Sequence, residues 1–329
     1  MKVFQDSISQ SRFLVTGGAG FIGSNLVERL FGMGAQHVRV LDNLSSGYYA
    51  NVKRFVGRPD FEFIEGDIRD IETCRKAVAG MDYISHQAAL GSVPRSLEDP
   101  VTSNDVNIGG HLNMLVAAKE SPSLKRMVYA ASSSSFGDSE ALPKEEGNEG
   151  KPLSPYAVTK WVNELYGDVF SRVYGLHTVG LRYFNIFGPK QNPNNPYAAV
   201  IPLFMKAAIE GVAPKINGDG SNSRDFTFVE NALEANIKAM MGTMELSRHE
   251  VVNIAVGDRT NLLELWEAIA AAAGTGIQPD FGPSRAGDIA HSLASIEKAR
   301  SLFGYDPKFR LKEGIAITFE WFKITYSDQ

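Results

Sequence analysis

The 329-residue chain has a single cysteine, no long apolar run and no excess of basic residues, and each of these absences narrows its class. The lone thiol, Cys74, cannot form an internal disulfide, so we expect a reducing compartment and a packing role for this side chain. Residues 1–10 are polar, unlike a signal peptide, and no apolar stretch is long enough to cross a membrane. A net charge of −5 argues against non-specific nucleic-acid binding. We expect a cytoplasmic protein that binds neither membranes nor nucleic acid.

Short apolar runs alternate with amphipathic stretches through the first half of the chain. Such alternation predicts parallel strands joined by crossover helices, in a sheet that is covered on both faces. The fold class is therefore α/β, with a Rossmann-type doubly wound parallel sheet. Strands are expected at 13–16, 38–42, 61–65, 83–87, 126–131 and 178–183, and helices at 24–33, 71–79, 107–119 and 156–173.

The composition changes after about residue 185, where 188–196 is rich in Pro and Asn, as in a loop. We predict two domains, 1–185 and 186–329, the second a smaller mixed α/β domain that is partly interleaved with the first. Further helices are expected at 201–210, 230–241 and 262–273, and a further strand at 251–255, whereas the tail 289–329 is mixed.

A glycine-rich turn, TGGAGFIG at 16–23, follows the first expected strand and opens a helix. Its glycines allow a tight turn and close approach of backbone N–H groups to a pyrophosphate, which a helix N-terminus also attracts. Asp42 ends the second strand, where a carboxylate accepts from the adenosine ribose hydroxyls and repels a 2′-phosphate. The order of these features predicts NAD rather than NADP.

Two later strand ends extend this site. Asp67, with Ile68, closes the third strand, and its carboxylate could meet the adenine amino group or cap the next helix. Gln87-Ala88-Ala89 ends the fourth strand, where small residues would let the backbone run under the phosphates and ribose of the cofactor.

Tyr156 and Lys160 stand four residues apart in a helix whose start is marked by Ser154 and Pro155. Residues so spaced share one helix face, and a cation beside a phenol lowers the pKa of the phenol. A phenol that loses its proton near neutral pH is a general base toward an alcohol. The alternative is a surface tyrosine over a solvated lysine, and the glycine-rich turn favours the catalytic reading.

Taken in order, these motifs resemble those of the extended short-chain dehydrogenases/reductases, and within that group the UDP-hexose 4-epimerase family. The resemblance covers nearly the whole chain. Its markers are TGGAGFIG at 16–23, LDN at 41–43, GDI at 66–68, QAA at 87–89, NIGGHLN at 107–113, SSSSFG at 132–137, SPYAVTK at 154–160, RYFNIFGP at 182–189, NGDGSNSRDF at 217–226 and RAGDIAHS at 285–292.

The resemblance implies that Tyr156 is the base, that Lys160 binds the nicotinamide ribose and tunes Tyr156, and that Ser132 is the third catalytic residue. In the implied cycle, C4 of the sugar gives a hydride to NAD, the 4-keto sugar turns, and the hydride returns to its other face. The implied cofactor contacts are Gly17, Gly20, Phe21, Ile22, Gly23, Asp42, Asn43, Ser46, Gly47, Asp67, Ile68, Gln87, Ala88, Ala89, Asn107, Tyr156, Lys160 and Tyr183.

The implied substrate contacts fall in both halves of the chain. Arg224 and Arg285 resemble arginines that grip the diphosphate through bidentate hydrogen bonds. The alternatives are surface ion pairs of Arg224 with Asp225 and of Arg285 with Asp288. The full set is Ser92, Ser132, Ser133, Tyr156, Asn185, Val200, Lys215, Ile216, Asn217, Arg224, Arg259, Arg285, Asp288 and Ser292.

Ser292 is the position from which we predict the sugar. Galactose-specific relatives carry a bulky aromatic at the corresponding place, so serine leaves room beside C2 for an N-acetyl group. We expect interconversion of UDP-N-acetylglucosamine (UDP-GlcNAc) and UDP-N-acetylgalactosamine (UDP-GalNAc), with some activity on UDP-glucose, because steric discrimination is worth only about 1–3 kcal/mol. Ser133 and Ser134 replace the Asp-Glu pair of related dehydratases, which disfavours dehydration. A UDP-hexuronic acid 4-epimerase and a non-catalytic NAD-binding sensor stay open.

Three positions depart from the family pattern, namely His111, Phe136 and Glu230. His86 and His291 flank expected site residues but are expected to be structural, and no constellation of His, Cys and carboxylates suggests a metal. The resemblance also implies a homodimer, in which the helices near 107–119 and 156–173 pair with their copies.

Overall fold

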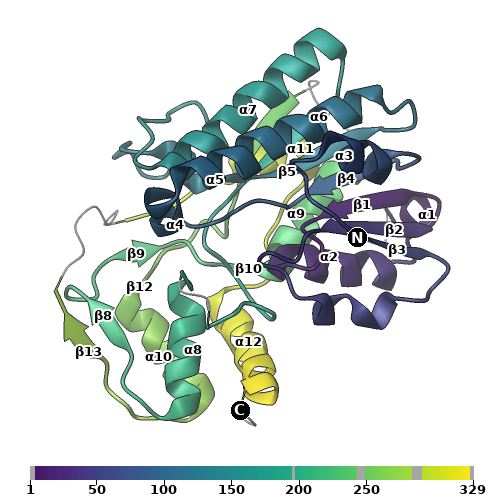
Figure 1. Ribbon diagram of the computed structural model, residues 1–329. Coiled ribbons are helices and arrows are strands. Elements are labelled where there is room, and N and C mark those ends of the chain that lie inside the picture. Colours follow the sequence, from purple (N-terminus) through teal and green to yellow (C-terminus); the bar gives the residue numbers. More distant parts are fainter. Residues whose placement is uncertain (1–3, 195–196, 243–248, 284–290, 327–329) are drawn as a thin grey trace.

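A seven-stranded parallel sheet forms the centre of the computed structural model, which describes residues 4–194, 197–242, 249–283 and 291–326. The strand order is β11-β6-β5-β4-β1-β2-β3 (Figure 1), the order of dinucleotide-binding sheets with one strand added at an edge. The predicted doubly wound fold is confirmed. The strands are β1 (Arg12–Thr16), β2 (His37–Asp42), β3 (Phe61–Glu65), β4 (Tyr83–His86), β5 (Arg126–Ser132), β6 (Thr178–Tyr183) and β11 (His249–Ile254).

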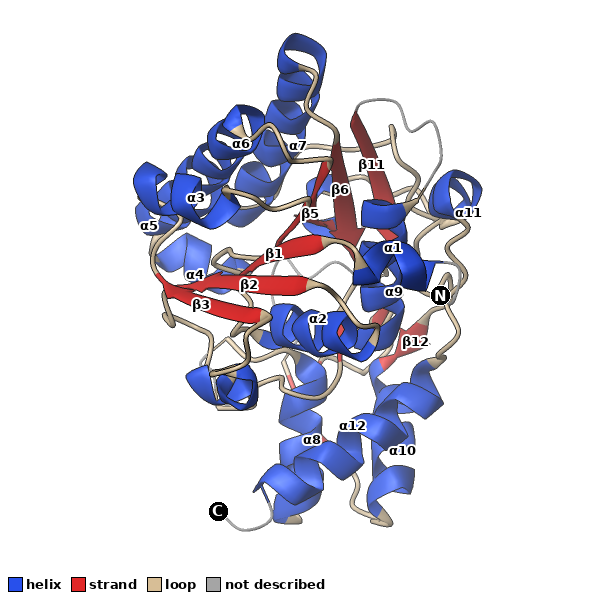
Figure 2. Cartoon of the chain, turned by 90° about the vertical axis from the view of Figure 1, so that its right-hand side faces the viewer, coloured by secondary structure: helices blue, strands red, loops and turns tan. Residues whose placement is uncertain are grey.

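Helices cover both faces of this sheet, as the apolar strands predict. Figure 2 shows α3, α6 and α7 on one side of the strands and α2 and α9 on the other. Successive residues of β1 feed two separate buried clusters, Leu14 one of them and Phe13 and Val15 the other, because neighbours on a strand point to opposite faces. These helices are α2 (Phe21–Gly32), α3 (Ile71–Val78), α6 (His111–Glu120), α7 (Pro155–Tyr174) and α9 (Val229–Met241).

Several short elements have no counterpart in the sequence prediction. Two short helices, α4 (Val93–Glu98) and α5 (Pro100–Asn104), precede α6, and the side chains of Ser92 and Asp99 cap them. A single π-helical turn, η4 (Asp105–Gly110), joins α5 to α6. The others are α1 (Gln5–Ser9), the 3-10 turns η2 (Tyr49–Asn51), η3 (Lys53–Phe55) and η5 (Ser133–Phe136), and α11 (Glu297–Phe303).

A lower lobe lies beneath the sheet in Figure 1 and is built on three helices and short strand pairs. Phe204 and Trp266 pack edge to face at 5.8 Å between two of its helices. The mixed tail at 289–329 contains the long third helix, which the sequence prediction did not resolve. The helices of the lower lobe are α8 (Val200–Glu210), α10 (Leu262–Ala273) and α12 (Leu311–Tyr326), and its strands are β8 (Lys215–Asn217), β9 (Ser223–Arg224), β12 (Thr260–Asn261) and β13 (Asp280–Gly282).

The two halves of the chain are interleaved. After α8 the chain forms β10 (Thr227–Phe228), which pairs with β7 (Ile186–Phe187) outside the main sheet. It then returns to the seven-stranded sheet through α9 and β11. The expected boundary near residue 185 stays a prediction, since elements from both sides of it share one sheet. No helix in the described part of the chain is long and apolar enough to span a membrane.

Candidate active site

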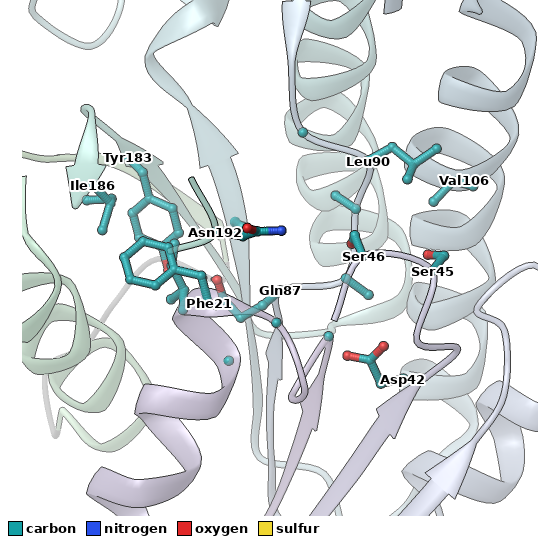
Figure 3. Close-up of a pocket in the computed structure, with 18 of the residues that line it drawn as sticks. Phe21, Asp42, Ser45, Ser46, Gln87, Leu90, Val106, Tyr183, Ile186 and Asn192 are labelled. Carbon is teal, nitrogen blue, oxygen red and sulfur yellow. The ribbon is translucent and has the colours of Figure 1, made fainter. Parts of the chain in front are cut away.

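A cavity of about 470 Å³ runs along the carboxyl ends of β1 to β6 (Figure 3). In open parallel sheets this edge is where ligands bind, because the turns after the strands converge there. It is lined by most of the residues expected at the site, including Gly17, Gly20, Phe21, Ile22, Gly23, Asp42, Asn43, Ser46, Asp67, Ile68, Gln87, Ala88, Ala89, Ser132, Tyr156, Lys160, Tyr183 and Asn185.

The glycine-rich turn is packed so closely that its glycines have no room for side chains. Gly17 has φ of 65°, and a Cβ there would lie 2.8 Å from the backbone nitrogen of Ala88. A Cβ on Gly23 would lie 2.2 Å from the carbonyl oxygen of Gly17. Within the described residues, no side chain caps the N-terminus of α2, which starts at the cavity. The turn therefore fits the pyrophosphate of NAD, which would meet backbone N–H groups here.

Asp42 holds the glycine-rich turn as well as lining the cavity. Its carboxylate accepts hydrogen bonds from the N–H groups of Ala19 at 2.9 Å and Leu44 at 2.8 Å. Burial raises the pKa of Asp42, and these two bonds oppose that rise. Gly47 does not line the cavity and instead packs on the turn, where its Cβ would lie 3.0 Å from Asp42 Oδ2.

Asp67 faces the cavity and is not a helix cap. A hydrogen bond from Arg69 holds the pKa of Asp67 at about 2, and Asn43 Nδ2 donates to its Oδ2 at 2.8 Å. Asp70 caps α3 instead, accepting from the N–H groups of Glu72 and Thr73. The capping alternative for Asp67 is therefore wrong, and its expected contact with the adenine stays a prediction.

Ser132 lies at the end of β5, and its hydroxyl is oriented by a neighbour. Ser132 Oγ accepts from Ser134 N–H at 3.2 Å and from Ser134 Oγ at 2.8 Å. With both lone pairs used, its own proton is available to an acceptor in the cavity. Tyr156 lies in the first turn of α7, which Ser154 caps by accepting from Ala157 N–H, as the sequence predicts.

Tyr156 and Lys160 meet in the cavity, but not with the expected effect on the phenol. Lys160 Nζ lies 5.8 Å from the Tyr156 ring centroid and donates to the carbonyl oxygen of Ala130 at 2.8 Å. The prediction of a lowered Tyr156 pKa is wrong for this state, because burial raises it and only the interaction with Ser132 opposes the rise. Burial also lowers the pKa of Lys160 to about 8. Both side chains therefore lie in a site where burial disfavours an isolated charge.

Comparison with known proteins agrees with this geometry. Residues 13–255 match the NAD dependent epimerase/dehydratase family. The chain belongs to this family. It is 35% identical over 312 residues to a putative UDP-glucose 4-epimerase of Methanocaldococcus jannaschii, covering 94% of this chain and 98% of that one. It is 37% identical over 314 residues to a UDP-glucose 4-epimerase of Mycolicibacterium smegmatis, covering 95% and 98%.

Comparison with solved structures supports the same family. A UDP-N-acetylglucosamine 4-epimerase from Methanobrevibacter ruminantium, in complex with UDP-N-acetylmuramic acid, superposes with a TM-score of 0.89 at 37% identity, covering 95% of this chain and 98% of that one. The UDP-glucose 4-epimerase of Thermus thermophilus in complex with NAD gives 0.83 at 34% identity, covering 95% and 99%. The chain is thus an NAD-dependent enzyme of the UDP-hexose 4-epimerase family, as the motifs indicate.

Some expected contacts of the epimerase lie outside the cavity lining. Asn107 is buried beneath it, and its amide bonds both the N–H and the carbonyl of Leu90, at 2.8 and 3.0 Å. It therefore positions a lining residue and does not line the cavity itself. Ser92, Ser133 and Val200 are each adjacent to lining residues without being among them.

None of the described substrate residues expected at 186–329 is among the residues that line the cavity. Ser292 N–H donates to the carbonyl of Ser223 at 3.0 Å, which brings Ser292 beside Arg224. Asp225 is fully buried and accepts from the N–H groups of Val256 and Gly257, so it serves the backbone instead of pairing with Arg224 at the surface. Lys215, Ile216 and Asn217 form β8, Arg259 is exposed, and Arg285 and Asp288 lie outside the described residues.

The loop at 188–194 is a part of the site that sequence reasoning missed. Lys190, Gln191 and Asn192 line the cavity, and the Asn192 side chain hydrogen-bonds the hydroxyl of Tyr48 across it. Asn25 Nδ2 ties the same loop to α2 through the carbonyl of Pro189 at 3.0 Å. The Pro and Asn content indicates a loop, but nothing local to it indicates its partner. Arg95 and Tyr197 also line the cavity and were not predicted.

The histidines have structural surroundings. His86 is buried with Nδ1 at 2.7 Å from Thr16 Oγ1, and burial lowers its pKa to about 3, with the charge of Lys160 adding to the effect. Cys74 is buried as expected, and its pKa is raised to about 12, mainly by burial. In the described part of the chain, no group of His, Cys, Asp and Glu side chains could hold a metal ion.

Proposed function

We propose that this enzyme interconverts UDP-GlcNAc and UDP-GalNAc by inverting C4 of the sugar. The observation that supports the reaction is the convergence of Ser132, Tyr156 and Lys160 on the cavity that the glycine-rich turn opens. When bound, NAD supplies a hydride acceptor that later returns the hydride to the opposite face of the sugar. The side chains of the protein carry out every proton transfer.

Tyr156 takes the proton of the sugar 4-hydroxyl as the C4–H bond breaks, and gives it back when that bond re-forms. The ammonium of Lys160, 5.8 Å from the ring centroid, stabilises the phenolate that the transfer requires. The Ser132 hydroxyl, oriented by Ser134, donates to the reacting oxygen. Since the buried site raises the pKa of the phenol, proton removal depends on these two neighbours.

The proposed preference for an N-acetylated sugar rests on Ser292 and on one solved structure. Ser292 is half-buried beside Arg224, and its side chain is much smaller than the aromatic that galactose-specific relatives carry. The UDP-N-acetylglucosamine 4-epimerase that superposes on this chain supports the same choice. Discrimination by volume is modest, about 1–3 kcal/mol, so UDP-glucose should react more slowly instead of not at all.

One observation favours a second candidate, a UDP-hexuronic acid 4-epimerase. Arg95 lines the cavity with its guanidinium 5.0 Å from the Tyr197 ring centroid, where it could meet a sugar carboxylate. A UDP-glucuronic acid 4-epimerase from Bacillus cereus superposes with a TM-score of 0.86 at 28% identity. Against this candidate, no hydrogen bond or ion pair within the described residues orients the Arg95 guanidinium for a bidentate contact with a carboxylate.

The deciding experiment is incubation with UDP-GlcNAc, UDP-glucose or UDP-glucuronic acid without added reductant, followed by proton NMR of the products. UDP-GlcNAc should give UDP-GalNAc fastest. Turnover of the uronic acid alone would overturn the sugar preference, and no turnover of any of the three would favour a sensor. The same assay on Tyr156→Phe excludes a contaminating epimerase.

We also propose that the enzyme is a homodimer through α7. Val158, Leu165, Val169 and Val173 are 45%, 57%, 40% and 64% exposed, and their spacing puts them on one helix face. Such an apolar stripe is expected to be covered by a second copy. Sedimentation should show a dimer that Leu165→Glu converts to a monomer, whereas Val212→Glu, at an equally exposed valine of the lower lobe, should leave it intact.

A further inference from the structure

Four tyrosines line the cavity, and two of them, Tyr156 and Tyr183, are held differently. Tyr156 has its hydroxyl near Ser132, whereas Tyr183, at the end of β6, is held from behind by an amide that does not line the cavity. Figure 3 shows the Tyr183 ring beside Phe21, with Gln87 next to them. Gln87 and Tyr183 lie at the ends of strands that are separated by β5, and a third group bonds both side chains.

That third group is Asn236 on α9, which is fully buried. Its Nδ2 donates to the carbonyl of Ala232 at 2.8 Å, which fixes which end of the amide is the donor. The same Nδ2 donates to the hydroxyl of Tyr183 at 2.7 Å, and the hydroxyl donates to Gln87 Oε1 at 3.2 Å. Gln87 Nε2 returns to Asn236 Oδ1 at 3.0 Å. The three side chains therefore form a closed cycle of hydrogen bonds.

A fourth side chain, Ser85, bonds two members of this cycle. Ser85 Oγ donates to Asn236 Oδ1 at 3.1 Å and accepts from Gln87 Nε2 at 2.9 Å. Both hydrogens of the Gln87 amide and the only hydrogen of the Tyr183 hydroxyl are thus used within this network. These residues therefore present a ligand with a fixed surface formed by the Tyr183 ring and the Gln87 amide.

We propose that Asn236 is a positioning residue for the cofactor, which acts by holding Gln87 and Tyr183 in the orientation that NAD binding requires. The inference rests on NAD occupying this cavity, and it is independent of which sugar reacts. Burial raises the pKa of Tyr183 to about 12, which agrees with a phenol that stays protonated within the cycle. The proposal extends the site to α9, which follows the expected domain boundary in the chain.

Removing the Asn236 amide leaves buried polar atoms without partners. Gln87 Nε2 loses one acceptor and the Tyr183 hydroxyl loses its donor, so the Gln87 amide is expected to turn into the cavity in search of another. The Tyr183 and Gln87 side chains would then no longer be ordered before the cofactor binds, and ordering them would cost binding free energy. The loss should appear in the affinity for NAD first, and only through that in turnover.

Asn231 provides a matched control on the same helix. It is also buried, and its amide makes a comparable set of bonds, accepting from Lys308 N–H at 3.0 Å and donating to the carbonyl of Phe309 at 2.8 Å. These partners lead to α12 and away from the cavity. Asn231→Ala should therefore cost stability without changing the affinity for NAD.

The experiment measures Kd for NAD by calorimetric titration of the nucleotide-depleted full chain, so it needs no sugar and separates this proposal from the choice of substrate. Asn236→Ala should raise Kd about ten-fold, which is ~1.4 kcal/mol. Gln87→Ala should raise it similarly, and the double variant should add less than about two-fold to Gln87→Ala, because the two residues act through one contact. With NAD saturating, KM for the sugar nucleotide should be unchanged in Asn236→Ala.

Equal losses of NAD affinity from Asn236→Ala with and without Gln87 would overturn the proposal, since Asn236 would then act independently of Gln87. So would an unchanged Kd, or an equal loss in Asn231→Ala. If Asn236→Ala does not fold, Tyr183→Phe opens the same cycle by removing one hydroxyl. It should raise Kd in the same direction, and an unchanged Kd in that variant contradicts the proposal as well.

Discussion

The carboxyl edge of the sheet and the lower lobe both carry residues expected at the active site, but they hold them in different ways. Ser132 and Tyr183 end strands of seven and six residues and line the cavity. Lys215 and Arg224 stand on strands of three and two residues, outside that lining. We therefore propose that the reaction chemistry depends on the long strands of the sheet and substrate recognition on these shorter elements. Variants in the two regions should separate effects on kcat from effects on KM.

The largest effect is expected at the sheet edge from Tyr156→Phe. Loss of the base should lower kcat by about 10³-fold, within the range of general acid–base catalysis, while Kd for NAD stays within about two-fold. Steady-state assays and NAD titration check this. Tyr166→Phe, two to three turns further along α7, is the control and should keep full activity. A Tyr156→Phe enzyme with undiminished kcat would remove the phenol from the mechanism.

Gly23→Ala tests how tightly the glycine-rich turn is built. Its new Cβ would lie 2.2 Å from the Gly17 carbonyl oxygen, so the backbone of the turn must move. We expect NAD affinity to fall about 100-fold, because the N–H groups of the turn would lose their positions. Gly32→Ala, at the end of the same helix, meets nothing within 4 Å and should bind NAD normally. Equal affinities for the two variants would show that the turn tolerates the shift.

Arg224→Met tests the lower lobe. If its guanidinium binds the diphosphate in ground and transition states alike, KM should rise about 10- to 100-fold with kcat nearly unchanged. Kinetics with UDP-GlcNAc measure both parameters. Arg172→Met on α7, where the arginine pairs with Asp168 at the surface, is the control. A fall in kcat equal to the rise in KM would break the proposed division between the two regions.

The smallest effect concerns Asp225, which joins the lower lobe to the end of β11. Burial raises its pKa to about 6 from 3.8. Between these values the folded chain holds a proton that the unfolded chain releases, so the free energy of unfolding falls as pH rises from about 4 to 6. This contribution is on the order of 2 kcal/mol. Asp225→Asn should flatten that part of the profile in urea unfolding at pH 4 to 7, and an unchanged slope would contradict the assignment.

The strands and the chemistry at their ends could be predicted from sequence, since alternation and turn residues are local signals. The ends of parallel strands share one edge, so Gly17, Asp42, Gln87 and Ser132 could be brought together without coordinates. The contact between Asn192 and Tyr48 could not, because it joins segments far apart in the chain. The bonds between the Asn107 amide and the backbone of Leu90 could not be predicted either, and a cofactor contact of Asn107 stays a prediction.

The helices missed were those whose signals are short or mixed. α4 and α5 have six and five residues, too few for a periodic apolar pattern, and only their caps mark them. The lowered pKa expected for Tyr156 was wrong because a pair spacing says nothing about burial, and burial is the larger influence. Sequence reasoning therefore places groups better than it predicts their protonation.

Strand β11 has a consequence for how this polypeptide can be made. His249–Ile254 supplies the partner for the outer edge of β6, and β6 carries Tyr183 at its end. A nascent chain that has left the ribosome only as far as residue 185 presents that edge with its amides unpaired, ready to join the same edge of another nascent chain. A gene split at this point should yield insoluble fragments, and a workable split must keep the last strand with the other six.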